Sequence, residues 1–332
     1  MDSQARVRAA LKLGRPDRPP VGWWGHTYRE EWSPRDLARV TVARQRGYGW
    51  DFVKLQPRAC CFAQAFGSKY RPSGDARVKP ILLRPAVTAP EDWSRLPSID
   101  GGAPPLRDQV EALRKVVQAV GPSVPVIQTV FSPLTVAGYL VGEERPRAVD
   151  ELRERPEQVG AALERIADAL ADFAAWSMAA GAAGIFYAVS GYASSDLLSM
   201  EEYERLALPH DRRVLASVAG QAWFNVLHLC GARIHFELAA ALAPHAVSWS
   251  VHEAGNPSLA EGRVRSGLAV MGGLDQEGTL VRGSPRAVFE EARAAVSGTE
   301  GAGLLLAPGC SVPPEAPEEN LWAVTRSVRD PS

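Results

Sequence analysis

The sequence predicts a single α/β domain over residues 1–332, a (β/α)8 TIM barrel with an N-terminal helical extension and an inserted segment between the second and third strands. Three observations support this fold class. The chain has 332 residues, a length that one barrel of alternating strands and helices commonly reaches. Eight short runs of β-branched or aromatic residues alternate with segments of helical period. Several helical segments begin with Ser or Pro and end with Gly, the usual start and stop signals.

The eight predicted strands are short apolar runs rich in Val, Ile, Phe, Tyr and Trp, the residues that suit a pleated, buried surface. They are VGWWGH (21–26), DFVKL (51–55), VPVIQTVF (124–131), GIFYAVS (184–190), AWFNVLHL (222–229), AVSWSV (246–251), LAVMGGL (268–274) and GLLLA (303–307). Nearly continuous apolar runs of this kind are typical of parallel strands buried on both faces.

The predicted helices fill the intervals between these strands, and one more helix precedes the first strand at about residues 3–13. The intervals with helical period are 33–47, 105–121, 155–181, 199–220, 234–243, 258–267, 284–298 and 317–330. Residues 66–105 are rich in Pro and Gly and contain KPILLRPAV, so we expect an inserted lid or hairpin outside the barrel there.

The composition limits the class of partner. Hydrophobic residues make up 46% of the chain and charged residues 23%, with a net charge of −1, which is typical of a globular protein with a large core. The chain has no basic run or basic-aromatic stripe, so nucleic acid is not an expected partner. It also lacks the roughly 20-residue apolar stretch of a membrane span and the apolar core of a signal peptide, so we expect no membrane partner and a cytoplasmic location.

The stretch NVLHLCG, residues 225–231, carries the strongest chemical signal. Side chains alternate along a strand, so His228 and Cys230 point to the same side. Cys310 follows the last predicted strand, and the carboxyl ends of barrel strands meet at one rim. One imidazole and two thiolates suit zinc, and three protein ligands leave the fourth position open, as in catalytic zinc sites.

A structural interpretation of the same residues stays open at this point. The four cysteines are too few for a disulfide framework in a chain of this length, and free cysteine is commonly buried as a small apolar residue. On that interpretation Cys230 and Cys310 are packing residues, and His228 is a core histidine that hydrogen-bonds a backbone carbonyl. The spacing alone does not choose between the two interpretations.

Other polar side chains also fall at predicted strand ends. Arg29 follows the first strand, Arg58 the second and Tyr139 the third. His252 and Glu253 follow the sixth strand. Barrel enzymes gather their active sites at this rim, so these residues are candidates for substrate or cofactor contacts.

Four stretches of the chain carry a resemblance to a known family: LGRPDRPPV, SPLTVAGYLVG, EEYERLALPHDRRVL and PGCSVPPEAPEENL. In this order they resemble the uroporphyrinogen decarboxylase superfamily, over nearly the whole chain. The superfamily comprises tetrapyrrole decarboxylases and zinc-dependent methyltransferases, which move a methyl group from a corrinoid protein to a thiol such as coenzyme M. The resemblance implies the barrel independently of the strand pattern.

The decarboxylase branch fits the rim poorly. Its arginine-rich stretch after the first strand, similar to RQAGR, clamps substrate carboxylates, whereas this chain reads GHTYR, with Gly25 at the first arginine and only Arg29 remaining. Its aspartate after the second strand aligns with Arg58, a cation that cannot accept hydrogen bonds from pyrrole N–H groups. Its histidine after the last strand is replaced by Cys310, and only Tyr139 matches a tyrosine that the decarboxylases use.

The methyltransferase branch carries His-x-Cys after the fifth strand and a cysteine after the eighth, and this chain has both. By similarity His228, Cys230 and Cys310 hold zinc, and either His252 or Glu253 fills the fourth position until the thiol arrives.

The resemblance therefore implies a zinc-dependent methyltransferase that moves a methyl group from methylcobalamin, carried by a partner corrinoid protein, to a small thiol or related acceptor. We assign catalytic roles to Tyr139 and Glu253. Arg29 and Arg58 are expected to hold an anionic tail of the donor or acceptor, and Trp24 is expected to line the mouth, with core packing as its alternative role. A tetrapyrrole decarboxylase is the first alternative function, and a barrel that binds a tetrapyrrole or other small molecule without turnover is the second. The sequence leaves the oligomeric state open, although the decarboxylase branch tends to form homodimers.

Overall fold

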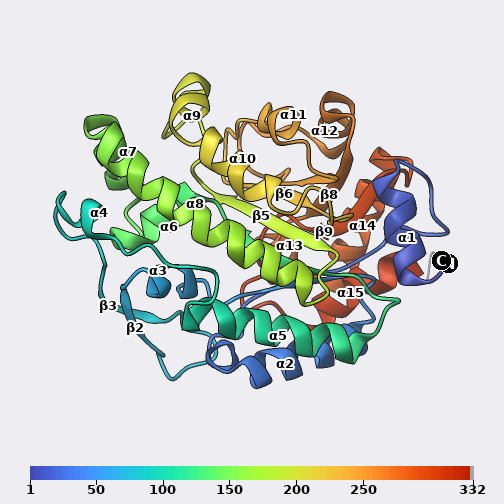
Figure 1. Ribbon diagram of the computed structural model, residues 1–332. Coiled ribbons are helices and arrows are strands. Elements are labelled where there is room, and N and C mark those ends of the chain that lie inside the picture. Colours follow the sequence, from blue (N-terminus) through green and yellow to red (C-terminus); the bar gives the residue numbers. More distant parts are fainter. Residues whose placement is uncertain (330–332) are drawn as a thin grey trace.

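Seven parallel strands form the central sheet, and helices surround it in the computed structural model of Figure 1, which describes residues 1–329. The strands pair in the order β1 (Val53–Leu55), β4 (Val126–Phe131), β5 (Gly184–Ser190), β6 (Val226–Cys230), β7 (Ala246–Ser248), β8 (Ala269–Leu274) and β9 (Leu304–Pro308). All six pairings between neighbours are parallel. Chain order and spatial order agree, which is the topology of a barrel of βα units, so the predicted fold class is confirmed.

The first predicted strand, residues 21–26, is wrong in extent. Val21 alone bridges β9, through Leu306, and its carbonyl accepts the N–H of Asp51 at 2.8 Å. The N–H of Val21 donates to the Asp51 carboxylate at 3.0 Å, so a side chain replaces a strand carbonyl there. Beyond Val21 the backbone leaves the sheet, and the carbonyl of Trp24 accepts the N–H of Val312 at 2.8 Å.

Asp51 also ties the N-terminal helix to this closure of the sheet. Its carboxylate accepts hydrogen bonds from Arg6 at 2.7 Å and Arg18 at 2.6 Å, and from the hydroxyl of Ser3 at 2.8 Å. The side chain of Asp51 is 1% exposed. Helix α1 (Ser3–Leu11) is therefore the predicted extension, and it is joined to the barrel by buried charges.

The outer layer consists of helices whose ends follow the sequence signals. Ser33, Ser132 and Ser284 cap helices with Pro in the first turn, and Ser199 and Ser258 form capping boxes. The predicted helix at 199–220 is two helices, which meet at Ala207 just before Pro209. Besides α1 and the short turn η1 (Glu30–Trp32), the helices are α2 (Pro34–Tyr48), α3 (Cys61–Ala65), α4 (Asp92–Arg95), α5 (Pro104–Val120), α6 (Pro133–Leu140), α7 (Arg145–Glu154), α8 (Pro156–Ala179), α9 (Met200–Leu206), α10 (Leu208–Ala216), α11 (Leu238–Leu242), α12 (Leu259–Ser266), α13 (Thr279–Arg282), α14 (Pro285–Gly298) and α15 (Glu318–Arg329).

The insert between β1 and β4 contains an antiparallel hairpin, as predicted, formed by β2 (Lys69–Arg71) and β3 (Ile81–Arg84). The hairpin lies at the same end of the molecule as α3 and α4 (Figure 1). Its turn accepts the N–H of Tyr28 through the carbonyl of Ala76 at 3.2 Å, and the N–H of Val87 donates to Leu140 at 2.9 Å. These two hydrogen bonds hold the insert against the loop that contains Tyr28 and against the end of α6.

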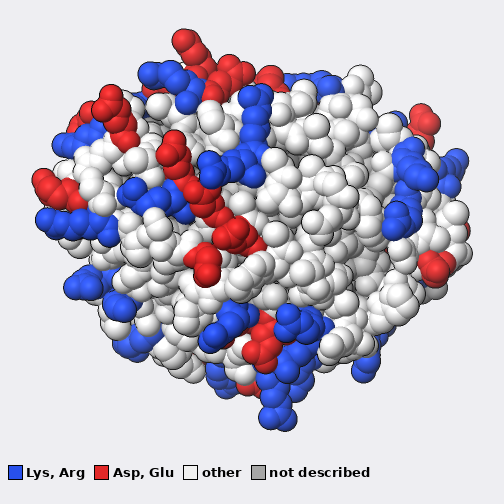
Figure 2. All heavy atoms as spheres, viewed as in Figure 1, with Lys and Arg blue, Asp and Glu red and all other residues white. Residues whose placement is uncertain are grey.

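The strand register defines the inner face of the barrel. Paired residues of parallel strands point to the same side, and the register places Ala188, His228, Ser248, Met271 and Leu305 in one row. Within residues 1–329, no helix combines the length and the apolar character needed to cross a bilayer. Positive and negative side chains are interspersed over the face in Figure 2, which accords with the near-zero net charge.

Candidate metal centre

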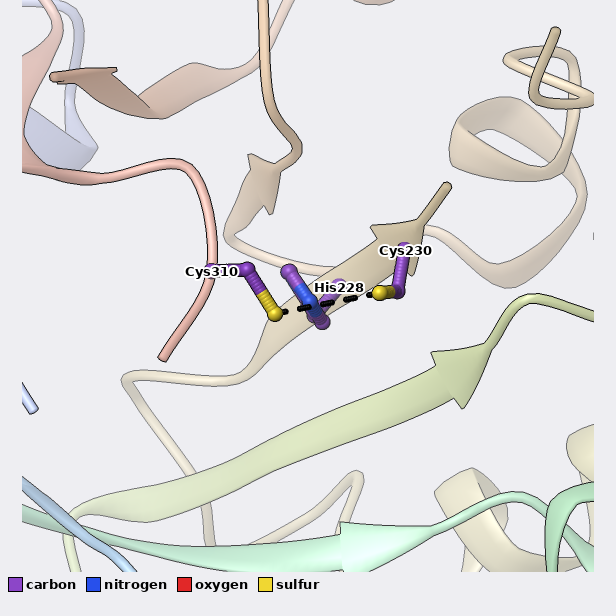
Figure 3. Close-up of side chains that lie close together, drawn as sticks. All are labelled: His228, Cys230 and Cys310. Carbon is purple, nitrogen blue, oxygen red and sulfur yellow. Dashed lines mark hydrogen bonds between the residues drawn. The ribbon is translucent and has the colours of Figure 1, made fainter. Parts of the chain in front are cut away.

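His228, Cys230 and Cys310 converge at the end of the barrel where the strands finish (Figure 3). His228 and Cys230 lie on β6, and Cys310 lies in the loop directly after β9. The two sulfur atoms are 3.7 Å apart, and a ring nitrogen of His228 lies within 4.8 Å of both. The structure thus brings together the three residues that the sequence predicted as metal ligands.

The spacing of these donors suits zinc. A tetrahedral zinc ion with Zn–S bonds of about 2.3 Å holds two sulfur ligands roughly 3.8 Å apart. The 3.7 Å between the sulfurs of Cys230 and Cys310 is close to that value, and it is far longer than the roughly 2 Å of a disulfide. Two sulfurs and an imidazole nitrogen within 4.8 Å of one another are close enough to bind one ion after small side-chain rotations.

The pKa values of the two neighbouring thiols are shifted in opposite directions. The hydrogen bond from Cys230, with further stabilisation from His228, holds the pKa of Cys310 well below its usual range. The same contact with Cys310, together with burial, raises the pKa of Cys230. A thiolate beside a thiol is a site that gains from a cation, because metal binding ionises the second sulfur as well.

Two contacts orient the imidazole of His228. Its Nδ1 lies 3.2 Å from the hydroxyl of Ser248, the residue that pairs with it on β7, so Nε2 is the nitrogen left for the metal. The ring of Phe186 stacks on the imidazole at 5.0 Å between centroids. His228 is only 3% exposed, so its ring cannot turn freely into solvent.

Gly309 allows Cys310 to approach the other ligands. A Cβ at Gly309 would lie 2.6 Å from Cα of Ser250 and 2.9 Å from Oε1 of Gln276. The chain therefore passes too close to the ends of β7 and β8 for any larger residue, and this approach sets the position of the neighbouring cysteine.

His252 and Glu253 lie differently with respect to the three ligands. Nε2 of His252 is 3.1 Å from Glu291, and this ion pair raises the pKa of the histidine. His252 does not join the group of three donors among the described residues. Glu253 is exposed, and its charge contributes to the raised pKa of Cys230, so it lies within electrostatic range of the centre.

The predicted cofactor contacts of Trp24 and Arg58 lie inside the protein. Trp24 is 3% exposed and packs edge-on against Phe186 at 5.2 Å, the core role given above as its alternative. The guanidinium of Arg58 is buried, donates to the carbonyl of Glu31 at 3.3 Å and lies 4.5 Å above the ring of Trp32.

Arg29 and Tyr139 occupy different surroundings. Arg29 is 67% exposed and pairs with its neighbour Glu30 at 3.1 Å. Tyr139 is half-buried on α6 beside Phe131, and burial raises the pKa of its hydroxyl. Of these two residues, only Tyr139 is enclosed by the protein.

Two basic side chains within electrostatic range of the cysteines, Lys54 and Arg145, were not among the predicted site residues. Arg145 lies at the start of α7 over the backbone of Gly191, where a Cβ would be 2.6 Å from its Nη1. Its charge opposes the rise in the pKa of Cys230. Of these two residues, only Lys54 could have been noticed in the sequence, because a lysine within the apolar run DFVKL is unusual.

The family model described as "Uroporphyrinogen decarboxylase (URO-D)" matches residues 3–331. The chain belongs to the uroporphyrinogen decarboxylase family. Within this family its curated relatives carry two kinds of name. The methylated-thiol–coenzyme M methyltransferase of Methanosarcina mazei is 25% identical over 346 residues, covering 99% of this chain and 90% of the relative. The methylcobamide:CoM methyltransferase MtaA of Methanosarcina barkeri is 27% identical over 310 residues, covering 90% and 85%.

A uroporphyrinogen decarboxylase of Saccharopolyspora erythraea is 33% identical, but over 158 residues that cover 43% of this chain and 39% of the relative. Among solved structures, a methyltransferase from Methanosarcina mazei superposes with a TM-score of 0.84 over 99% of both chains, at 23% identity. A B12-independent methionine synthase from Shewanella sp. W3-18-1 superposes with a TM-score of 0.57, at 15% identity, over 89% of this chain and 86% of that one. These superpositions show the fold.

Proposed function

We propose that this protein is a zinc-dependent methyltransferase that moves a methyl group from a corrinoid, presented by a separate protein, to the sulfur of a small thiol. The convergence of His228, Cys230 and Cys310 within 4.8 Å at the carboxyl end of the barrel is the observation that carries the proposal. The methyltransferase names of relatives aligned over at least 90% of this chain support it. We take residues 1–332 to act as one domain.

Zinc at this site would supply a Lewis acid that lowers the pKa of a bound thiol while its sulfur stays nucleophilic. The chain contributes three ligands, and Ser248 holds the imidazole of His228 in the tautomer that leaves Nε2 free. Glu253 is our choice for the fourth position before the thiol binds, since His252 is engaged with Glu291.

The open end of the site must also admit the methyl donor. The sulfur, the methyl carbon and the leaving metal of the corrinoid must lie nearly in line, and correct alignment can supply several kcal/mol of the barrier reduction. Tyr139 on α6 is one enclosed polar side chain at the carboxyl end of β4, and we assign it to contacts with the donor or acceptor. Arg29 is exposed enough to meet the partner protein.

The first experiment measures bound metal and methyl transfer together. Protein purified under reducing conditions is expected to bind one zinc per chain and to transfer methyl from free methylcobalamin to 2-mercaptoethanesulfonate, followed by the absorbance change of the corrinoid. Cys230→Ser and Cys310→Ser should lose the metal and at least a hundredfold in rate. Cys60→Ser is the matched control, because Cys60 is buried outside this group of donors and should keep both properties.

Two outcomes would overturn the proposal. Wild-type protein that binds no zinc at any loading would remove the basis for thiol activation. Decarboxylation of a porphyrinogen by the purified chain, without methyl transfer, would favour the decarboxylase alternative.

A further inference from the structure

Lys54 is a buried, positively charged side chain of the barrel. It lies in the middle of β1, is 6% exposed, and makes no ion pair within 4 Å in the described part of the chain. Burial lowers the pKa of this lysine to about 7, while charges at Cys310 and Glu31 act in the opposite direction. A buried ammonium costs several kcal/mol unless an opposite charge compensates it, so its presence needs a reason.

The ammonium packs against an aromatic ring that also contacts one of the three candidate ligands. Nζ lies 4.8 Å from the ring centroid of Phe186, the same ring that stacks on His228 at 5.0 Å. Nζ also lies 5.5 Å from the ring centroid of Trp24. The lysine therefore packs against the ring that stacks on His228, although 174 positions in the sequence separate it from His228 and 256 from Cys310.

A directed chain of hydrogen bonds holds the ammonium in place. Lys54 donates to Oε1 of Gln56, and the amide of Gln56 contacts Nε2 of His26 at 2.8 Å. Nδ1 of His26 contacts Oε1 of Glu31, also at 2.8 Å. An imidazole that carries its hydrogen on Nδ1 satisfies both contacts, so every donor in the chain points from Lys54 towards Glu31. Among residues 1–329 the ammonium donates one hydrogen bond, to Gln56, so two of its three N–H groups remain available for a ligand.

The net charge of the metal centre indicates that the ligand of the ammonium is an anion. A divalent ion with two cysteine thiolates and a neutral imidazole has no net charge, and a bound substrate thiolate makes it −1. A buried negative charge needs a nearby positive one. Lys54 is a buried cation one aromatic ring away from His228, and within residues 1–329 it has no carboxylate partner within 4 Å.

We propose that Lys54 is a positioning residue for the acceptor, whose ammonium balances the charge of the substrate thiolate at the metal. The inference rests on the proposed function and adds to it a group that selects an anionic sulfur over a neutral ligand. Gln56, His26 and Glu31 hold the ammonium towards the centre.

The test compares an anionic with a neutral ligand at the same metal. Protein loaded with Co²⁺ is titrated with 2-mercaptoethanol, followed by the thiolate-to-cobalt charge-transfer band, and separately with imidazole, followed by the ligand-field bands. Lys54→Met removes the charge and keeps the length of the side chain. Lys54→Arg keeps the charge, and Lys115→Met on the exposed face of α5 is the matched control.

Two unit charges roughly 6 to 10 Å apart, at an effective dielectric constant of about 20, interact strongly enough to change binding about tenfold to a hundredfold. We expect Lys54→Met to weaken binding of 2-mercaptoethanol by this factor and to leave imidazole and cobalt affinity within about twofold. Lys54→Arg should recover part of the thiol affinity, and Lys115→Met should resemble the wild type. Thermal unfolding of Lys54→Met should occur at or above the wild-type temperature, because the variant removes an uncompensated buried charge.

The test distinguishes a failure of the proposed function from a failure of the inference about Lys54. Wild-type protein that does not bind cobalt would overturn the proposed function and this inference with it. Cobalt binding with equal affinity of wild type and Lys54→Met for 2-mercaptoethanol would overturn the inference alone. An equal loss for thiol and imidazole would assign Lys54 to the packing of the site and would also overturn it.

Discussion

Asp211 gives a prediction in which the sign and the size of a pH effect follow from the structure. It lies on α10, fully buried, and accepts hydrogen bonds from Tyr187 of β5 at 2.6 Å and from Tyr203 of α9 at 2.7 Å. Burial raises the pKa of this carboxyl to about 7, and the two hydroxyls only partly oppose the rise. In the unfolded chain the same carboxyl has a pKa of about 3.9.

The raised pKa makes the folded state bind a proton that the unfolded state has already released. The stabilisation from this proton is complete below the pKa of the unfolded chain, and it is lost as the pH rises through about 7. Between pH 5 and pH 8 the expected loss is about 2 to 3 kcal/mol in the free energy of unfolding.

Asp211→Asn removes the titration and keeps the shape of the side chain. Urea unfolding of wild type and variant at pH 5 and at pH 8 yields four free energies of unfolding. The contributions of the other titrating groups to the pH dependence are the same in both proteins, so they cancel when the two pH dependences are subtracted. The wild type should lose about 2 to 3 kcal/mol more than the variant on going to pH 8. Equal losses in both proteins would refute the assignment of a raised pKa to Asp211.

Further predictions concern the closure of the barrel and the metal ligands. Asp51→Asn should lower the free energy of unfolding by about 3 to 5 kcal/mol in urea titrations, because it leaves buried guanidinium groups without their charge partner, whereas Asp17→Asn, at a carboxyl that is 44% exposed, should cost about 1 kcal/mol or less. Ser248→Ala should weaken zinc binding roughly tenfold in a chelator competition, because it frees the ring of His228, and unchanged affinity would refute that role. In the same competition Glu253→Gln should weaken binding about tenfold and His252→Ala should not; the reverse order would make the histidine the fourth ligand.

Local patterns in the sequence determined much of the fold. The Ser-Pro starts of the predicted helices at Ser33 and Ser284 were correct, because a cap is a contact between residues three positions apart. Seven of the eight predicted strands were found for a similar reason, since burial on both faces makes a strand apolar along its whole length. The remaining prediction, the first strand at 21–26, was wrong because the N–H of Val21 donates to the Asp51 side chain. A pattern of apolar residues does not reveal such a contact.

For the candidate metal ligands, the sequence determined some features and the tertiary structure determined the others. The sequence determined that His228 and Cys230 share a side, because alternation along a strand is local, and it placed Cys310 at the same rim through the order of parallel strands. Only the tertiary structure decided that the two sulfurs stand 3.7 Å apart, that Arg58 is buried against Trp32, and that Lys54 packs against the ring that stacks on His228. These facts depend on strand register and on the closure of the sheet, which join residues far apart in the chain and leave no local trace in the sequence.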